Sequence, residues 1–252
     1  MITVRINTQD LVSSLFMRLT VSGIFSLMLG SFFLPGCWAS FPSKILLATH
    51  NQAPYGSYQP SGSFDGLAYQ VVECALAQLG VAFNLHVVPW KRAQREVYIG
   101  VADGFFAASQ NSERDKYAVK SRSILEQQWT WYFLKTAKMK PDNKQFKHQA
   151  RVSSFLGANM HSYLKQQGYQ VLSVPPGSTK QLVQMLKLKR IDAALASSDV
   201  MEHVLKDNRW HGQLVAHPFK SKPLAVYFGI PFIKRYPAFL GAFNQQVANC
   251  RM

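Results

Sequence analysis

The sequence carries the same order of elements twice, and this repetition constrains the fold more than any single motif. Strand-type and helix-type patterns alternate as β-α-β-α-β over residues 43–108 and again over residues 151–196. Each set ends with a helix, a short turn and an Asp that leads into an apolar strand, at Val101-Ala102-Asp103-Gly104 and at Arg190-Ile191-Asp192-Ala193. Such alternation predicts an α/β fold with parallel strands, and two sets predict two similar lobes.

Apolar periodicity places the individual elements of each set. Leu67 to Leu79 has apolar residues along one helical face, and Gly80 follows it as a stop signal. The first set is expected as strand 43–49, helix 67–79, strand 83–87, helix 89–100 and strand 105–108. The second set is expected as strand 151–155, helix 159–167, strand 171–174, helix 178–189 and strand 191–196.

An arginine lies in an unusual position after the strand at 105–108. A short helix begins near Asn111, which places Arg114 in its first turn. Cations are disfavoured there because the helix dipole is already positive. The placement therefore suggests a convergent anion site, in which a guanidinium group joins free backbone N–H groups. The alternative is a solvated arginine flanked by Glu113 and Asp115.

The stretch from Asp103 to Ser123 resembles the bacterial periplasmic solute-binding proteins of family 3. The resemblance is carried by Asp103, Ser109, Glu113-Arg114 and a serine at position 121 or 123, and it extends from about Ile45 to Val247. It implies the α/β type 2 periplasmic binding protein fold, with two βαβαβ lobes joined by two hinge strands and a ligand held between them.

The resemblance also implies how the chain is divided. Residues 40–130 plus 225–252 would form a discontinuous lobe I and residues 131–224 lobe II. Independently, the apolar run from Val21 to Leu34 follows Arg18 and precedes small residues, so residues 1–39 are expected to be a signal peptide. Two apolar strands, Gln127 to Leu134 and Leu224 to Ile230, would carry the chain into the second lobe and back. A lysine-rich connection at 135–147 and a last helix with Phe239, Phe243 and Val247 on one face complete the expected fold.

Several site residues follow from the resemblance. Arg114 and Ser109 would bind the ligand's carboxylate, and Trp90 would present its ring to the ligand's body, unless it is a core tryptophan at a helix start. The family commonly has an aromatic residue just ahead of an Ala-Pro pair, where this chain has Gln52. Tyr55, next to that pair, could substitute for it or simply pack within the loop.

Lobe II would contribute three further residues. Asn159 lies where the family aims a helix N-terminus at the ligand's anionic group, although it could equally be a helix N-cap. Amino-acid binders carry an Asp five residues after the position of Asp192, and it pairs with the ligand's α-amino group. This chain has Ser197 there and Asp199 two residues later. If Asp199 only caps the next helix, the site has no ammonium partner.

The three cysteines are Cys37, Cys74 and Cys250. In the family fold, the helices that carry Cys74 and Cys250 both belong to lobe I, so a disulfide between them is expected to secure the C-terminus. The alternative is two unpaired thiols. Cys37 would be removed with the signal peptide or lipidated, since Leu34-Pro35-Gly36-Cys37 is similar to a lipobox.

Composition excludes several function classes. The formal net charge is +15, but the basic residues are scattered among apolar segments rather than gathered in a run. We therefore expect no nucleic-acid partner, and a positive surface or site for an anion instead. No metalloprotease, CxxC, nucleophile-elbow or Walker pattern is present, and the histidines show no metal-ligand pairing, so neither a metal nor a cofactor is expected.

The leading hypothesis is an exported, monomeric, periplasmic binding protein. It would capture a small carboxylated solute for an ABC-type permease or a membrane sensor, and it would touch the membrane only if Cys37 is lipidated. One alternative is an enzyme on the same fold, similar to cyclohexadienyl dehydratase, with Asp199, Glu202 or Asp65 as a general acid. Another is a degenerate member that docks a partner and binds no ligand.

Overall fold

A computed structural model of the chain describes residues 41–206 and 212–251. The described residues belong to one compact unit. The predicted signal peptide and the lipidation of Cys37 lie outside the described residues. No helix within the described ranges is both long and apolar enough to cross a membrane.

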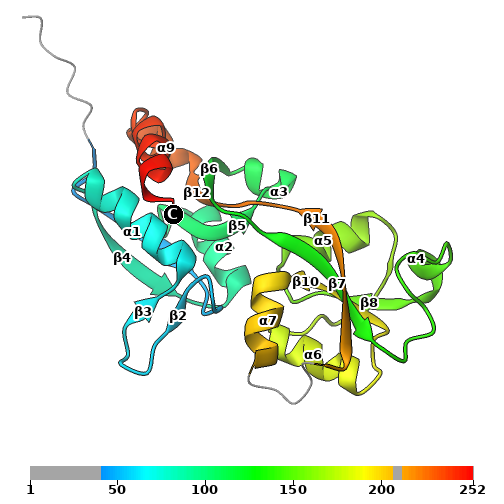
Figure 1. The fold of residues 1–252 in the computed structure, drawn as a ribbon. Coiled ribbons are helices and arrows are strands. Elements are labelled where there is room, and N and C mark those ends of the chain that lie inside the picture. Colours follow the sequence, from blue (N-terminus) through cyan, green and yellow to red (C-terminus); the bar gives the residue numbers. More distant parts are fainter. Residues whose placement is uncertain (1–40, 207–211, 252) are drawn as a thin grey trace, which may run out of the picture. The chain divides into compact units, whose positions relative to one another are not determined.

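The first sheet has five strands in the order β4-β1-β5-β12-β6 (Figure 1). β1 pairs in parallel with β4 and β5, and β12 runs antiparallel to β5 and β6. Its strands and helices are β1 (Lys44–Thr49), α1 (Leu67–Gln78), β4 (Ala82–Val87), α2 (Trp90–Tyr98), β5 (Gly104–Ser109), α3 (Ser112–Asp115), β6 (Ala118–Leu125), β12 (Leu224–Gly229), α8 (Ile230–Arg235) and α9 (Phe239–Cys250). A small hairpin of β2 (Ser57–Tyr58) and β3 (Phe64–Asp65) lies between β1 and α1 in the chain.

The second sheet also has five strands, in the order β11-β7-β10-β8-β9. β8 is parallel to β9 and β10, whereas β7 is antiparallel to β10 and β11. Its elements are β7 (Gln128–Leu134), α4 (Phe146–Gln149), β8 (Arg151–Ser153), α5 (Asn159–Gln166), β9 (Gln170–Val171), α6 (Thr179–Lys187), β10 (Ala193–Ser197), α7 (Ser198–Lys206) and β11 (Leu214–Ser221).

The chain passes between the two sheets at two adjacent points. β6 is followed by β7 after Glu126 and Gln127, and β11 is followed by β12 after Lys222 and Pro223. The backbone N–H of Lys222 donates to the carbonyl of Gln127 at 2.8 Å, so the two connections are hydrogen-bonded to each other. Two short neighbouring connections of this kind can serve as a hinge, because only a few backbone angles have to change when the two sheets move relative to each other.

The structure confirms the two predicted βαβαβ sets. It differs from the prediction mainly in polar segments. β11 was not expected, because its residues are mostly exposed and Pro218 interrupts the pattern; such a strand is tolerated at a sheet edge. The strand expected at 171–174 ends at Val171. The connection at 135–147 is less open than expected, since Phe146 begins α4 and is buried.

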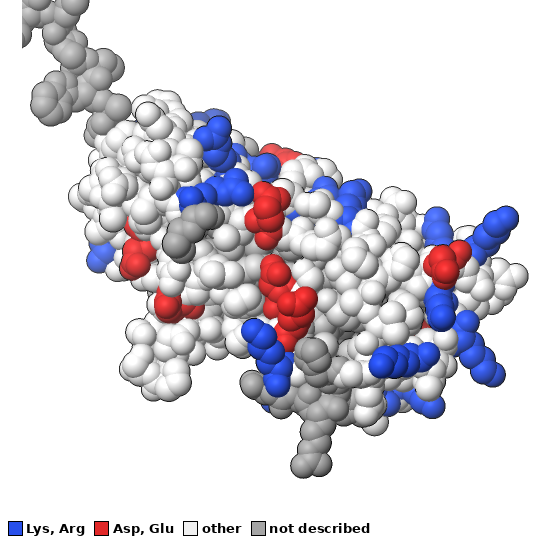
Figure 2. All heavy atoms as spheres, in the orientation of Figure 1, with Lys and Arg blue, Asp and Glu red and all other residues white. Residues whose placement is uncertain are grey.

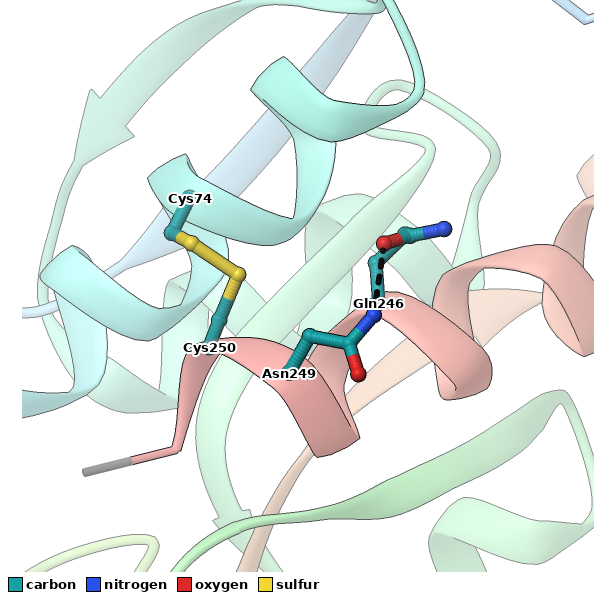
Figure 3. Close-up of a disulfide and its surroundings, with 4 residues drawn as sticks. All are labelled: Cys74, Gln246, Asn249 and Cys250. Atoms are coloured by element: carbon teal, nitrogen blue, oxygen red, sulfur yellow. Dashed lines mark hydrogen bonds between the residues drawn. A yellow bond between two sulfur atoms is a disulfide. The ribbon is translucent and has the colours of Figure 1, made fainter.

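The predicted disulfide is present between Cys74 and Cys250 (Figure 3), with Cα atoms 5.9 Å apart. It joins the middle of α1 to the last residue of α9, and these helices also pack against each other. Apolar side chains of both helices belong to one buried cluster with the first sheet, among them Val72, Leu76, Phe239 and Phe243. The final helix is therefore held covalently as well as by packing.

Charged side chains are dispersed over the surface that Figure 2 displays. Lys and Arg residues are separated by uncharged atoms and interleaved with Asp and Glu. Among the described residues, Arg92 forms an ion pair with Glu96, and Arg151 forms one with Asp192. This face does not present the continuous basic stripe that is typical of nucleic-acid-binding proteins.

Candidate functional site

The predicted site residues converge on a cavity at the carboxyl ends of β1, β5 and β10. Its volume is about 30 Å³, enough for about one water molecule. It is lined from the first sheet by His50, Gln52, Trp90, Ser109 and Arg114, and from the second by Phe155, Asn159, Thr179 and Ser197, among others. A wider cavity of about 610 Å³ adjoins it and shares His50, Gln52, Trp90, Phe155, Thr179 and Val200.

Arg114 is 3% exposed, so the solvated alternative is wrong. The short helix α3 is capped by Asn111, whose side chain accepts from the N–H of Glu113. Arg114 is the residue of α3 whose side chain is buried. Its Nη1 donates to the carbonyl of Ser109 at 2.6 Å and its Nε donates to Gln94 Oε1 at 3.0 Å. Both partners are neutral.

The Arg114 guanidinium has hydrogen-bonding capacity that its two acceptors do not use. Within the described residues, its Nη2 donates no hydrogen bond and no carboxylate forms a salt bridge with the group. Burial lowers the pKa of Arg114 to about 10, which still leaves it protonated at neutral pH. A buried cation without an anionic partner, lining a cavity, can accept the carboxylate of a ligand.

Trp90 is both a buried core residue and a residue of the cavity lining. It begins α2 directly after Pro89, is 6% exposed, and packs edge-on to Phe105 with ring centroids 5.6 Å apart. Its ring also lies 5.3 Å from the guanidinium carbon of Arg114 and lines both cavities. The tryptophan is therefore part of the core and part of the cavity wall.

His50 belongs to the same wall and was not singled out by the sequence. Its ring lies 4.5 Å from Trp90 and 6.1 Å from Phe155, and its Nε2 contacts Gln52 Oε1 at 2.9 Å. Burial lowers the pKa of His50 to about 4, and Arg114 adds to the effect, so the imidazole is neutral. Its buried Nδ1 has no hydrogen-bond partner among the described residues. Its place directly after β1 was the available signal.

Tyr55 connects the first sheet to the second. Its side chain is 2% exposed, and its hydroxyl lies 2.6 Å from Ser197 Oγ and donates to Asp199 Oδ2 at 2.9 Å. Burial raises the pKa of the phenol well above its usual value. Ser197 ends β10 and Asp199 lies in the first turn of α7. The expectation that Tyr55 stands in for a ring over the ligand is not met by its position, since it does not line either cavity.

Asn159 makes a second connection between the sheets. It is the first helical residue of α5, and Ala158 occupies the N-cap position, so the N-cap alternative is wrong. Its Nδ2 donates to Ser109 Oγ at 3.1 Å and to the carbonyl of Gln110. Its Oδ1 accepts from Asn111 Nδ2 at 2.8 Å. Gln94 adds a third connection nearby, from its Nε2 to the carbonyl of Gly157 at 3.3 Å.

The cavity therefore gathers six of the eight predicted ligand residues. Gln52, Trp90, Ser109, Arg114, Asn159 and Ser197 line it. Tyr55 and Asp199 lie outside the lining, where Tyr55 contacts Ser197 and donates to Asp199. No group of three or more potential metal ligands occurs within the described residues.

Comparison with known proteins identifies the fold. No protein-family model matches the sequence, and no curated protein matches it. Solved structures match most of it. A histidine kinase sensor domain similar to periplasmic binding proteins is 14% identical, with a TM-score of 0.72 over 82% of this chain and 90% of that chain. The protein has the two-lobed, type 2 periplasmic binding protein fold.

Two further structures show the range of functions on this fold. A substrate-binding protein of an ABC uptake transporter from Streptococcus pneumoniae, with bound histidine, is 14% identical with a TM-score of 0.68 over 82% of this chain and 86% of that chain. An ancestral amino-acid-binding protein, described as a precursor of cyclohexadienyl dehydratase, is 18% identical with a TM-score of 0.68 over 82% and 89%. A transporter binding protein, a sensor domain and the binding-protein precursor of an enzyme all have this fold, so the function has to be argued from the site.

Proposed function

We propose that this protein is a family 3 solute-binding protein that captures a small carboxylated solute between its lobes. The observation that carries the proposal is the buried Arg114 guanidinium, which has an unused Nη2 and lines a cavity built by both lobes. Ser109 beside it would add a hydroxyl donor to the carboxylate, and Trp90 would pack against the body of the solute. A charge-assisted pair of this kind is stronger in a buried site, where the effective dielectric constant is lower than in water.

Ligand entry requires the lobes to separate. Lobe I, proposed as residues 40–130 plus 225–252, and lobe II, proposed as residues 131–224, are joined by direct hydrogen bonds through Tyr55, Asn159 and Gln94. A cavity of about 30 Å³ is too small for an amino acid or a comparable acid. The structure is thus a closed state, and the proposed ligand would enter an open state and be enclosed by rotation at the two connections.

The proposed setting is the periplasm. The resemblance to exported binding proteins and the disulfide between Cys74 and Cys250 support it, because disulfides persist in oxidising compartments. The protein would then deliver its solute to an ABC-type permease or present its closed form to a membrane sensor. The sensor domain and the transporter protein among the structural relatives support both kinds of partner equally.

The enzyme alternative finds less support in the site. Asp65 Oδ1 accepts from the backbone of Gly66 and from Gln70, and Glu202 is exposed on α7. Asp199 accepts from Tyr55. No Asp or Glu of the described residues lines either cavity, so no carboxylic acid is placed to transfer a proton to an enclosed ligand. The docking alternative is weakened by the presence of a closed, well-lined cleft.

A thermal-shift screen followed by calorimetric titration tests the proposal. A bound solute raises the melting temperature by mass action. Removing Arg114 forfeits a charge-assisted pair of about 1.5–3 kcal/mol, so Arg114→Ala should weaken binding roughly ten- to hundredfold. Arg95→Ala, which removes an exposed arginine from α2, is the matched control. Equal affinity of Arg114→Ala and wild type for the identified solute would refute the site.

A further inference from the structure

We infer that the solute is a carboxylate without an ammonium group, and that a hydroxyl group takes the place of the amine. The inference rests on the proposed function, since it concerns the ligand of the same cleft. It separates this protein from the amino-acid binders that share its fold. Three features of the cleft carry it: the charge of its lining, the engagement of Asp199, and the unpartnered nitrogen of His50.

The lining of the cleft is cationic or neutral throughout the part of the chain that the structure describes. Arg114 lines the narrow cavity, and Lys91 and Lys180 line the wider one together with His203. Neither lining contains an Asp or a Glu. An ammonium group enclosed here would be buried beside a guanidinium without a carboxylate to pair with, which costs several kcal/mol. An anion can instead pair with Arg114, which offsets the cost of removing it from water.

The acid closest to the site is already engaged. Asp199 Oδ2 accepts the Tyr55 hydroxyl at 2.9 Å, and the same hydroxyl lies 2.6 Å from Ser197 Oγ. Tyr55 is 2% exposed and comes from the other lobe. A ligand amine could reach Asp199 only by displacing the phenol, which would leave a buried hydroxyl without its partners. Tyr55, a residue of lobe I, thus donates to Asp199 the hydrogen bond that the α-amino group of a ligand would otherwise donate.

His50 lines both cavities and carries a hydrogen-bond acceptor that no described residue uses. With Gln52 Oε1 as acceptor at 2.9 Å, the His50 Nε2 carries the proton and Nδ1 keeps a free lone pair. That Nδ1 is buried and has no partner among the described residues. The ring packs on Trp90 and Phe155, so the acceptor is set within an aromatic wall. A neutral acceptor of this kind binds a hydroxyl donor and offers a buried ammonium no balancing charge.

Matched triplets of ligands test the inference. Each triplet shares one body and differs only in the 2-substituent: phenylalanine, 3-phenyllactate and 3-phenylpropionate; histidine, imidazole-lactate and imidazole-propionate; aspartate, malate and succinate. Calorimetric titration of the purified protein should show at least one hydroxy acid bound, its unsubstituted acid bound about tenfold more weakly, and its amino acid at least about a hundredfold more weakly.

The outcomes separate the inference from the proposed function. Amino acids that bind more tightly than their hydroxy acids, and lose affinity in Arg114→Ala, would overturn the inference and leave the proposed function standing. A panel in which no member binds would count against both. His50→Phe keeps an aromatic ring and removes the acceptor, so it should abolish the preference for the hydroxy acid over the unsubstituted acid; a preserved preference would contradict the role of Nδ1.

Asp199→Asn provides a second, independent readout. The amide oxygen of Asn can still accept from Tyr55, while the negative charge is removed, so the affinity for the bound acid should rise by about twofold. If Asp199 instead pairs with a ligand ammonium, the same substitution should weaken binding by at least about tenfold. Whether the affinity rises or falls therefore distinguishes an Asp199 that accepts from Tyr55 from an Asp199 that pairs with a ligand ammonium.

Discussion

Arg114 is a residue that we expect to lower the stability of the unliganded protein. It is 3% exposed, and its hydrogen-bond acceptors are a carbonyl and an amide rather than a carboxylate. Replacing a buried, unpaired cation by an apolar side chain of similar length removes a desolvation cost. Arg114→Met should therefore raise the unfolding free energy by about 1 kcal/mol while weakening ligand binding roughly ten- to hundredfold. Denaturant unfolding measures the unfolding free energy of the variant, and a clear loss of stability would contradict the prediction.

His50 makes the stability of the protein depend on pH. Its pKa is held at about 4 in the folded state against 6.5 for the free side chain, because burial disfavours the imidazolium. Between pH 6.5 and 4 the unfolded chain takes up a proton that the folded protein does not. Stability is thus fully present above pH 6.5 and falls by up to about 3 kcal/mol as the pH drops to 4.

The His50→Gln variant isolates this contribution, because glutamine does not titrate. Its unfolding free energy should fall less than that of wild type over the same pH window. The charged group beside His50 is Arg114, which remains protonated throughout, and Gln52 does not titrate. His161, whose pKa is also lowered by burial, is the comparison: His161→Gln should leave the contribution of His50 in place. Parallel pH curves for wild type and His50→Gln would contradict this account.

At the scale of elements, the disulfide is the strongest constraint on the C-terminal helix. Cys74 on α1 and Cys250 at the end of α9 are 176 residues apart. A link across so long a loop restricts the unfolded chain strongly, so the Cys74→Ser, Cys250→Ser double variant should lose about 2–5 kcal/mol. Unfolding with and without reductant measures the loss. The double variant should be insensitive to reductant; a wild type that is equally insensitive would show that no disulfide forms.

Which elements could be predicted depends on how local their signals are. The two βαβαβ sets were predictable because each strand and helix has its own apolar period. Edge strand β11 was not, since it is paired on one side only and its exposed residues carry no such period. The same holds for the site. Arg114 and Ser109 lie within one short motif, whereas Tyr55 meets its partner Asp199 across 144 residues. Such a contact depends on how the two sheets pack against each other, which no local sequence signal specifies.

At the scale of the whole molecule, the hydrogen bonds of the Tyr55 hydroxyl to Ser197 and Asp199 join the two lobes without a ligand. Tyr55→Phe removes both bonds and leaves Asp199 without that donor. We expect about 1–3 kcal/mol less stability and a shift toward the open state. Small-angle scattering of the unliganded protein should show a larger radius of gyration for this variant. Tyr58→Phe, on the exposed hairpin, is the matched control and should scatter like wild type.

The central claim is that a carboxylate is enclosed in the cleft between the lobes and pairs with Arg114. The most direct test is a crystal structure of the protein with the tightest acid from the ligand panel. The account predicts a carboxylate oxygen within about 2.7–3.0 Å of Arg114 Nη2, between the two lobes. It also predicts that Asp199 still accepts from Tyr55. A ligand bound outside the cleft, or one whose amine displaces Tyr55 from Asp199, would contradict it.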